Sequence, residues 1–497
     1  MIEDSFCFKV LEKMVLRLVA IWMSSITYAC YHKICECVGQ VFLDSGILGF
    51  FRGNWDKSIG TWRAIIPRTW HRITMLSARA TKEKKNVLAM AASESFFLRI
   101  FNQNFLILCL ATVFFAIPFL PTMLLALLCL ITLGVYDINL FMGRIRAQRT
   151  SLVSIFLGLF GICMIYGSFT SYNFPQALQV MAIFLLFMSM FFVAKDCIDT
   201  EEKLDFVLFV LISTGVLIAL YAVAQYVLGV EMDAAWVDAE SFNISTRAYA
   251  TFNNPNVLGE YLILIGSLAA GMLWKVRNWF GRLFYLVCFG IVCLGLLATN
   301  SRGAMLGLMF SAGLFVLLAE RRLIPLGIAG LVAMPFILPQ ELWARLLSSV
   351  TMSDSSSQYR LAIYEAGLDM VKQFWLTGTG VNSFNEMYPL FSREAANAFH
   401  VHNLFLQELI ELGFLGFGMM VLLFIFFFQK LYGCMKCVPK RFHVLLTAFF
   451  GGFAGLLLQG MTDYIWFDYS IVLLFWCFMG IGMASVRVGE QKWRKEK

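Results

Sequence analysis

The stretch from His400 to Gly418 reads HVHNLFLQELIELGFLGFG, and it places two histidines directly before a long apolar run. Residues 404–428 are almost wholly apolar. At about 1.5 Å per residue, a helix over them is long enough to cross a hydrocarbon core of about 30 Å. The stretch therefore predicts a membrane-spanning helix with imidazoles at its N-terminal, interfacial end.

His402 lies at the start of this predicted helix. The positive end of the helix dipole favours the neutral imidazole, whose lone pair is able to take a proton. A general base needs this property. A histidine that merely caps a helix at the membrane interface would show the same pattern, so both interpretations stay open from this stretch alone.

Gly413 and Gly416 share one face of the predicted helix, because they are three residues apart. Small residues on one face allow a neighbouring helix to approach closely. We expect packing to be the main role of these two glycines.

The composition excludes an ordinary soluble protein. Of 497 residues, 60% are hydrophobic and only 14% are charged, which predicts an all-α polytopic membrane protein. A net charge of +7 would suggest nucleic acid in a soluble chain, but lysine and arginine in cytoplasmic loops explain it here. We therefore expect the lipid bilayer as a partner, and no nucleic acid.

The thirteen cysteines predict neither a disulfide framework nor a metal site. Most lie in apolar segments or beside basic ones. The pairs Cys434-x-x-Cys437 and Cys35-x-Cys37 have metal-like spacing, but neither has a second pair or a suitably placed histidine. We expect no metal and no cofactor.

Hydropathy divides the chain into an N-terminal extension (1–98), a membrane domain (99–486) and a basic tail (487–497). The extension carries short apolar patches interrupted by charges, which predicts interfacial amphipathic helices. The membrane domain predicts about twelve transmembrane helices. Their approximate ranges are 104–117, 119–135, 152–169, 176–194, 205–228, 257–274, 283–299, 303–319, 323–338, 404–428, 443–460 and 470–485.

The distribution of basic residues predicts the orientation. With the N-terminus inside, the inner loops and the tail hold 19 lysines and arginines, whereas the longer outer loops hold 6. The positive-inside rule therefore places both termini in the cytoplasm and His402 on the extracytoplasmic side.

The one long outer loop spans residues 339–403. Within it Leu361, Tyr364, Leu368, Val371 and Trp375 recur at helical spacing, so a helix over about 358–374 would have an apolar face able to lie over the membrane domain. So few apolar positions would make a weak independent core, which favours a lid or an acceptor platform.

Two further outer motifs precede this loop. The first runs from Arg247 to Asn256 and ends in Asn-Asn-Pro-Asn, a turn that starts a helix. The second is the tight hairpin Asn-Ser-Arg-Gly around Arg302. A guanidinium at membrane depth is costly unless it binds an anion or performs a function, although snorkelling to lipid phosphates would also satisfy Arg302.

In this order, the motifs resemble the O-antigen ligase and polymerase superfamily of membrane glycosyltransferases over residues 247–418. The His-Asn-x9-Gly-x-x-Gly pattern beginning at His402 is similar to the ligase signature. The resemblance implies inverting, metal-independent transfer of a saccharide from undecaprenyl pyrophosphate on the outer face of the bacterial cytoplasmic membrane. The acceptor would be the lipid A core or another glycan.

The resemblance also implies residue roles. His402 matches the catalytic base, and Arg247 and Arg302 match the arginines that bind the pyrophosphate. We add four candidate substrate-binding residues: Asn256, Arg360, His400 and Asn403.

The chemistry agrees with these residue types, because an imidazole can take the proton of an attacking sugar hydroxyl while guanidiniums stabilise a pyrophosphate leaving group. The chain contains no Asp-x-Asp motif, which disfavours a metal-dependent reaction with a nucleotide sugar. A polymerase of the same superfamily is the nearest alternative. A polytopic transporter is the alternative from another class, but it predicts paired ionisable residues near the bilayer midplane and a repeat of two halves, which the sequence lacks.

Overall fold

The computed structural model of the chain describes residues 100–148, 151–231, 246–337, 343, 355–392 and 398–497. Within them are fourteen α-helices and no strands, which confirms the all-α prediction. The predicted interfacial helices of residues 1–98 lie outside the described residues. The helices are α7 (Gln103–Ala116), α8 (Thr122–Phe141), α9 (Leu152–Phe169), α10 (Phe174–Cys197), α11 (Glu201–Val227), α13 (Pro255–Lys275), α14 (Trp279–Ala298), α15 (Arg302–Leu318), α16 (Ile324–Ile337), α18 (Ser355–Phe374), α19 (Phe384–Phe391), α20 (Leu404–Cys434), α21 (Lys440–Gln459) and α22 (Tyr469–Glu496).

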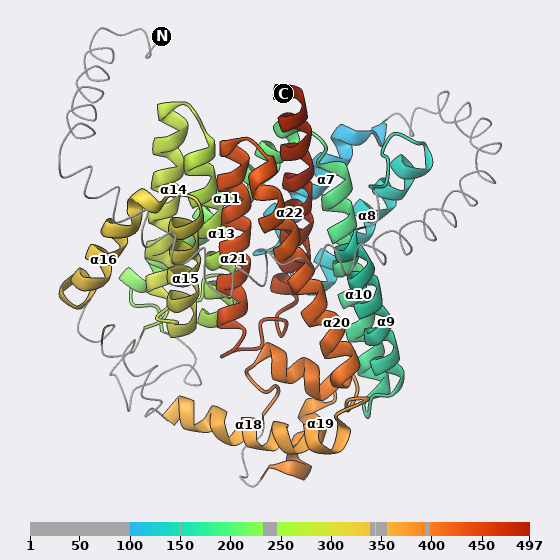
Figure 1. The fold of residues 1–497 in the computed structure, drawn as a ribbon. Helices are drawn as coiled ribbons and strands as arrows, with labels where there is room; N and C mark the ends of the chain where they lie inside the picture. The colour runs from blue at the N-terminus through green and yellow to red at the C-terminus, as the bar shows by residue number, and fades with distance from the viewer. Residues whose placement is uncertain (1–99, 149–150, 232–245, 338–342, 344–354, 393–397) are drawn as a thin grey trace, which may run out of the picture.

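Each of the twelve predicted apolar segments forms a helix. Among the described residues, nine helices are long and apolar enough to cross a membrane. The other three predicted segments form α7, α15 and α16, which have 14, 17 and 14 residues. The helices stand side by side, with α18 and α19 across one end of the bundle and the C-terminus at the other (Figure 1).

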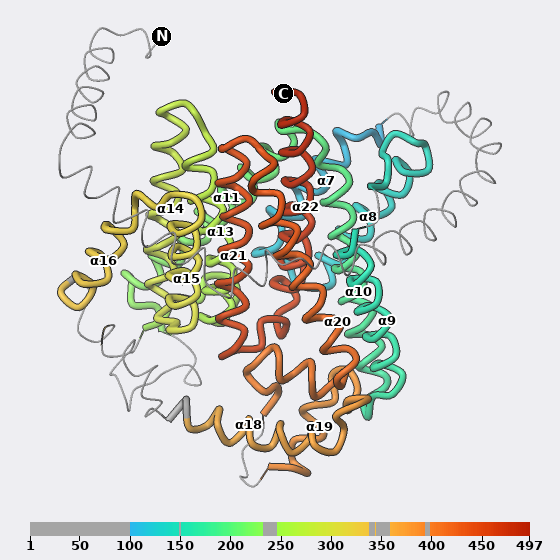
Figure 2. Tube along the Cα trace, viewed as in Figure 1, coloured from blue at the N-terminus to red at the C-terminus, as the bar shows by residue number. Residues whose placement is uncertain are grey.

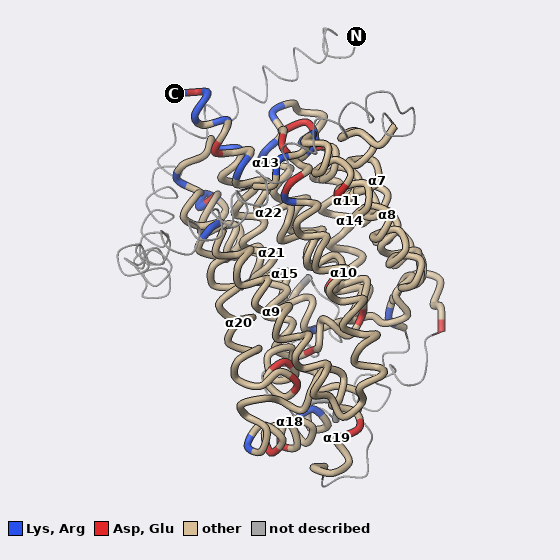
Figure 3. Tube along the Cα trace, turned by 90° about the vertical axis from the view of Figure 1, so that its right-hand side faces the viewer, with Lys and Arg blue, Asp and Glu red and all other residues tan. Residues whose placement is uncertain are grey.

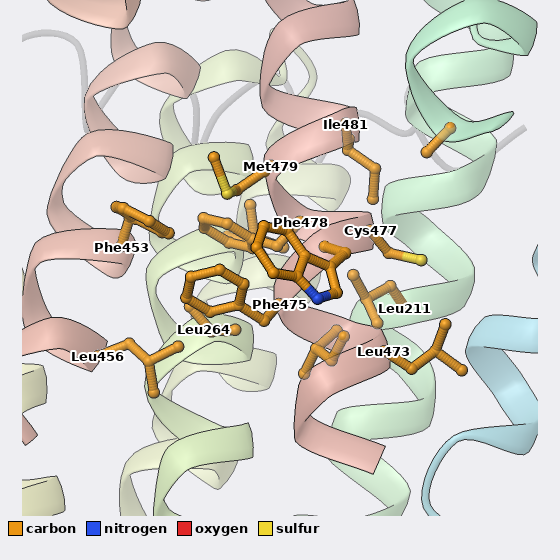
Figure 4. Close-up of a cluster of buried hydrophobic side chains, with 14 of the residues drawn as sticks. Leu211, Leu264, Phe453, Leu456, Leu473, Phe475, Cys477, Phe478, Met479 and Ile481 are labelled. Carbon is orange, nitrogen blue, oxygen red and sulfur yellow. The ribbon is translucent and has the colours of Figure 1, made fainter. Parts of the chain in front are cut away.

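Helix α22 forms the centre of the bundle, and 94% of its most apolar 18-residue stretch is buried inside the protein. It packs chiefly against α10 and also contacts α21, α20, α11 and α13. Its side chains Phe475 and Phe478 lie among Leu211 of α11, Leu264 of α13 and Phe453 of α21 (Figure 4). A helix surrounded by other helices is apolar on every face, as its sequence between residues 471 and 484 is.

Helices α15 and α21 approach each other at glycines. A Cβ added at Gly307 would lie 2.7 Å from the carbonyl oxygen of Gly455, and one added at Gly455 would lie 2.3 Å from that of Gly307. Larger side chains would push the helices apart, so these glycines allow the backbones to pack directly. This contact fixes the start of α15 beside the end of α21.

Helix α20 is broken at Gly413, where φ is 63° and ψ is −171°. The backbone N–H of Phe414 donates to the carbonyl of Trp375 (2.7 Å), and a Cβ added at Gly413 would lie 2.4 Å from the carbonyl oxygen of Leu376. The predicted helix over 404–428 is therefore confirmed as part of α20, but it contains a kink that the apolar pattern did not reveal. The neighbour of Gly413 is the chain after α18, not a packed helix. Figure 2 shows the trace of α20 turning between its short lower part and its long upper part.

The described part of the long predicted loop folds over the end of the bundle. Helix α18 confirms the predicted helix, but the face that packs inside the protein is Ile363, Ala366 and Met370, with α19 and the start of α20. Of the predicted stripe, Tyr364 and Val371 pack against this cluster, whereas Leu361, Leu368 and Trp375 are 45%, 50% and 56% exposed. The period of the apolar pattern therefore identified the helix, but only part of the predicted face.

Charged residues gather at the end of the bundle where the C-terminus lies (Figure 3). There Lys275 forms ion pairs with Asp205 (2.5 Å) and Glu201 (3.2 Å), and Arg441 pairs with Glu201 (2.8 Å). Lys275 and Arg441 belong to segments predicted to be cytoplasmic. The candidate site lies at the opposite end.

Candidate functional site

Asn256 is the centre of a hydrogen-bond network in the first turn of α13. Its side-chain oxygen accepts from Arg247 Nη2 (3.1 Å) and from the Ser301 hydroxyl (2.9 Å). Its amide nitrogen donates to Asp463 Oδ2 (2.9 Å), and its carbonyl accepts from Gln459 Nε2 (3.2 Å). This one residue therefore joins three segments that are far apart in the sequence.

The Asn-Asn-Pro-Asn motif starts a helix, as predicted, although α13 begins at Pro255 and not at the expected residue 257, so Asn256 lies in its first turn. Asn254 is the N-cap of α13, and its side chain accepts the Asn256 N–H (2.8 Å). Pro255 occupies the first helical position, where its missing N–H costs no hydrogen bond.

The segment around Arg247 is fastened to the hairpin between α14 and α15. Arg247 is buried, and its Nε donates to the carbonyl of Thr299 (3.0 Å). Asn300, with φ of 51°, donates its side-chain amide to the carbonyl of Thr246 (3.0 Å). The hairpin thus brings Arg302, at the N-terminus of α15, beside Arg247.

The start of α20 is held by Asn403. Its side-chain oxygen accepts the Leu406 N–H (3.0 Å), and its amide donates to the carbonyl of Met461 (2.9 Å). The Leu404 N–H donates to the carbonyl of Gly460 (2.7 Å). These contacts attach the histidine segment to the loop after α21, and they use both polar groups of Asn403.

His402 forms a pair with Asp463, a residue that the sequence analysis missed. The distance from His402 Nδ1 to Asp463 Oδ1 is 3.2 Å, and Oδ1 also accepts the Tyr464 N–H (2.9 Å). An ionised carboxylate only accepts hydrogen bonds, so Nδ1 carries a proton in this pair, and in the neutral ring the lone pair is then on Nε2. The feature of the sequence that could have identified Asp463 is its place as a carboxylate in a short outer loop between two apolar segments.

The surroundings of Asp463 favour its ionised form. Burial alone would raise its pKa, but the hydrogen bond and charge of His402, followed by the charges of Arg360 and His400, outweigh burial and lower the pKa. Asp463 is therefore able to orient the His402 ring and to stabilise the imidazolium that forms when Nε2 takes a proton.

His400 lies against His402, with ring centres 4.2 Å apart, and its Nδ1 accepts the backbone N–H of His402 (3.3 Å). The ring also packs on Phe467 at 4.5 Å. Burial, followed by the charge of His402, lowers the pKa of His400 to about 4. His400 is thus neutral near pH 7 and holds the backbone of His402 through an acceptor nitrogen.

A small polar cavity of about 60 Å³ brings together most of the predicted residues. Arginines from three segments line it, together with the Asp463 carboxylate. The start of α15 also contributes, and a helix N-terminus favours anions. The lining residues are Arg247, Asn256, Ser301, Arg302, Gly303, Arg360, Gln459, Thr462 and Asp463.

An apolar groove of about 1180 Å³ adjoins this cavity. It lies among α15, α16, α18 and the end of α21, and its walls include Leu306, Phe310 and Leu331. Arg302 and Arg360 line both spaces. The site therefore has a cationic part for an anionic group and an apolar part for a hydrocarbon chain.

Three potential metal ligands lie close together among the described residues, since one ligand atom each of His400, His402 and Asp463 falls within 4.8 Å of the others. The carboxylate of Asp463 and Nδ1 of both histidines already take part in hydrogen bonds within the site. Arginines, which repel cations, line the adjacent cavity.

A family model described as O-antigen ligase matches residues 287–421, whereas no curated protein matched the chain. The matched region runs from α14 into α20 and contains Arg302, Arg360 and His402. Arg247 and Asp463 lie outside it, but they line the same cavity as the two arginines. Over these residues the chain is similar to the O-antigen ligase family.

Proposed function

We propose that this chain transfers a saccharide from undecaprenyl pyrophosphate to a glycan acceptor, with the lipid A core as the preferred acceptor. The observation that carries the proposal is the shared lining of the two spaces by Arg302 and Arg360. A pyrophosphate in the arginine cavity would have its polyprenyl chain in the apolar groove. Guanidiniums suit this role because they bind phosphate oxygens in pairs of hydrogen bonds.

In the proposed reaction His402 Nε2 takes the proton from the acceptor hydroxyl. The hydroxyl oxygen forms a bond to the anomeric carbon, the bond from that carbon to the pyrophosphate oxygen breaks, and the electron pair leaves with the pyrophosphate. Asp463 stabilises the resulting imidazolium, and the arginines stabilise the leaving group. A single displacement of this kind inverts the anomeric centre.

The groups that the reaction requires are all side chains, so the proposed transfer is independent of metal. The positive-inside distribution supports placing the site on the extracytoplasmic face, in the inner membrane of a bacterium. A polymerase of the same superfamily would use the same base and arginines with a second lipid-linked saccharide as acceptor.

The test is transfer by the purified protein in liposomes, with a lipid-linked saccharide as donor and lipid A core or a second lipid-linked saccharide as acceptor. We expect His402→Ala to lower the rate by about 10²–10⁴, the usual loss for a positioned base, and His400→Asn to lower it much less.

Arg302→Lys should lose most activity, because an ammonium lacks the planar group of paired N–H donors that a guanidinium offers to phosphate oxygens. A chelator should leave the rate unchanged. Full activity of His402→Ala would overturn the proposal, and the preferred acceptor distinguishes ligase from polymerase.

A further inference from the structure

A second hollow, of about 610 Å³, lies where the end of α18 meets α19 and the turn between α9 and α10. Three of its lining side chains are aromatic: Tyr172, Phe374 and Phe391. Two are polar, Gln373 and Glu386, and both are exposed. The reaction described above uses none of these residues.

The aromatic rings form a connected, partly open surface. The Phe374 ring centre is 6.2 Å from that of Tyr172 and 6.4 Å from that of Phe391, with edge-to-face angles of 80° and 69°. Tyr172 is 60% exposed, so its ring is available to a ligand. Glu386 accepts a hydrogen bond from the Asn173 side chain, which holds the carboxylate beside Tyr172.

This combination suits a neutral sugar. The C–H groups on one face of a pyranose pack on the negative face of an aromatic ring, while its hydroxyls hydrogen-bond to amide and carboxylate groups. The lining residues, all within the described part of the chain, include one carboxylate but no lysine or arginine. A phosphate-bearing lipid headgroup is therefore disfavoured here, in contrast to the arginine cavity.

Helix α18 connects the two places. Arg360 lines the arginine cavity and Gln373 lines the hollow, and their separation along the helix is about 20 Å at a rise of about 1.5 Å per residue. We propose that this hollow is a glycan subsite that binds sugar units remote from the reacting one, several units along the saccharide. The identity of that saccharide rests on the proposed function.

Binding can be measured without transfer. The probe is the oligosaccharide released by mild acid from the lipid-linked saccharides of the host cell, and saturation-transfer NMR reports its binding to the full chain in detergent. Loss of one aromatic contact in Tyr172→Ala should weaken binding about three- to tenfold, whereas Tyr172→Phe should keep it. Tyr226→Ala is the matched control, because Tyr226 is 43% exposed at the same end of the bundle but does not line the hollow.

A kinetic measurement separates a subsite from a general structural effect. With a donor of several sugar units, Tyr172→Ala should raise KM by the same factor by which it weakens binding of the oligosaccharide, and kcat should stay unchanged. With a donor of one sugar unit, the KM of Tyr172→Ala should equal that of the wild type. Equal binding of the probe to Tyr172→Ala and the wild type would overturn the subsite. An active His402→Ala protein would overturn the proposed reaction instead, without altering the binding result.

Discussion

The backbone of His402 lies in the left-handed region, with φ of 49°, which is uncommon for a residue other than glycine. Its N–H donates to His400 Nδ1, and its carbonyl accepts from the Tyr364 hydroxyl (3.0 Å). Neighbouring side chains thus stabilise a conformation that turns the chain into α20 and directs the imidazole toward Asp463.

Replacing Asp463 tests whether the histidine acts as part of a pair. Asp463→Asn keeps the side-chain volume but removes the charge that fixes the ring tautomer and stabilises the imidazolium, so we expect kcat to fall about 10²–10⁴-fold. The measurement is kcat at saturating donor, together with the thermal midpoint of unfolding as a control. A normal kcat in a folded variant would show that His402 works without this carboxylate.

The lowered pKa of His400 makes stability depend on pH. Above about pH 6.5 the imidazole is neutral in both states, but between about pH 6.5 and 4 the unfolded chain binds a proton that the folded chain does not. The free energy of unfolding should therefore decrease as pH falls through this window. Because the pKa of Asp463 is lowered, the folded protein also loses stability to protonation of this carboxylate, but only when the pH falls below the ordinary aspartate pKa of 3.8.

His400→Asn is the control for this pH effect, because an amide oxygen can accept the His402 N–H without titrating. The thermal midpoint of each protein, followed by tryptophan fluorescence in micelles from pH 7.5 to 4.5, should fall more steeply for the wild type. Identical slopes would assign the pH dependence to other groups.

At the scale of elements, the break in α20 places the histidine segment. The part before Gly413 packs with α18 and α19, as the burial of Ile410 with Ile363 and Met370 shows. The part after Gly413 runs through the bundle. The loop from residue 375 to residue 381 fits into the break through backbone hydrogen bonds, including Thr379 N–H to the carbonyl of Ile410 (2.8 Å).

Two glycines in α20 provide a matched pair of substitutions. Gly413→Ala should lower the free energy of unfolding by about 1–3 kcal/mol or more, since the alanine is strained at a positive φ and its Cβ would overlap the Leu376 carbonyl. Gly418→Ala should be neutral or slightly stabilising, because nothing lies within 4 Å of its Cβ position. The thermal midpoints of the two variants in detergent give the comparison, and equal midpoints would contradict the break.

At the scale of the whole molecule, the prediction concerns sidedness. Cys437 is exposed, whereas Cys434 is buried and donates to Glu490 Oε1 (3.0 Å), so Cys437 is the better native reporter of the predicted cytoplasmic end. In intact cells an impermeant thiol reagent should modify a cysteine placed at Lys372, which is 75% exposed on α18, and should leave Cys437 unmodified. Peptide mass spectrometry identifies the modified residue. Modification of Cys437 before the cells are permeabilised would reverse the orientation.

Composition and hydropathy alone determined the fold class and the positions of the twelve apolar helices, because each helix in lipid requires a long apolar run that can be read directly from the sequence. They did not determine how many of these helices cross the membrane, since nine of the helices in the described residues are long and apolar enough to do so. Turn chemistry likewise predicted a helix start at the Asn-Asn-Pro-Asn motif, and α13 begins within it, at Pro255. The motifs around Arg247, Arg302 and His402 predicted a shared site, and the cavity brings the two arginines together with Asp463, the hydrogen-bond partner of His402.

Only the tertiary structure decided how these segments act on one another. Asp463 joins His402 and Asn256 across long stretches of sequence, and no local pattern records such a contact. The break at Gly413 also escaped the hydropathy pattern, since a kink stabilised by the backbone of another segment leaves the apolar run unchanged. The same holds for the groove beside the arginines and for the aromatic hollow, because the shape of a cavity depends on how helices pack and not on the sequence of any one of them.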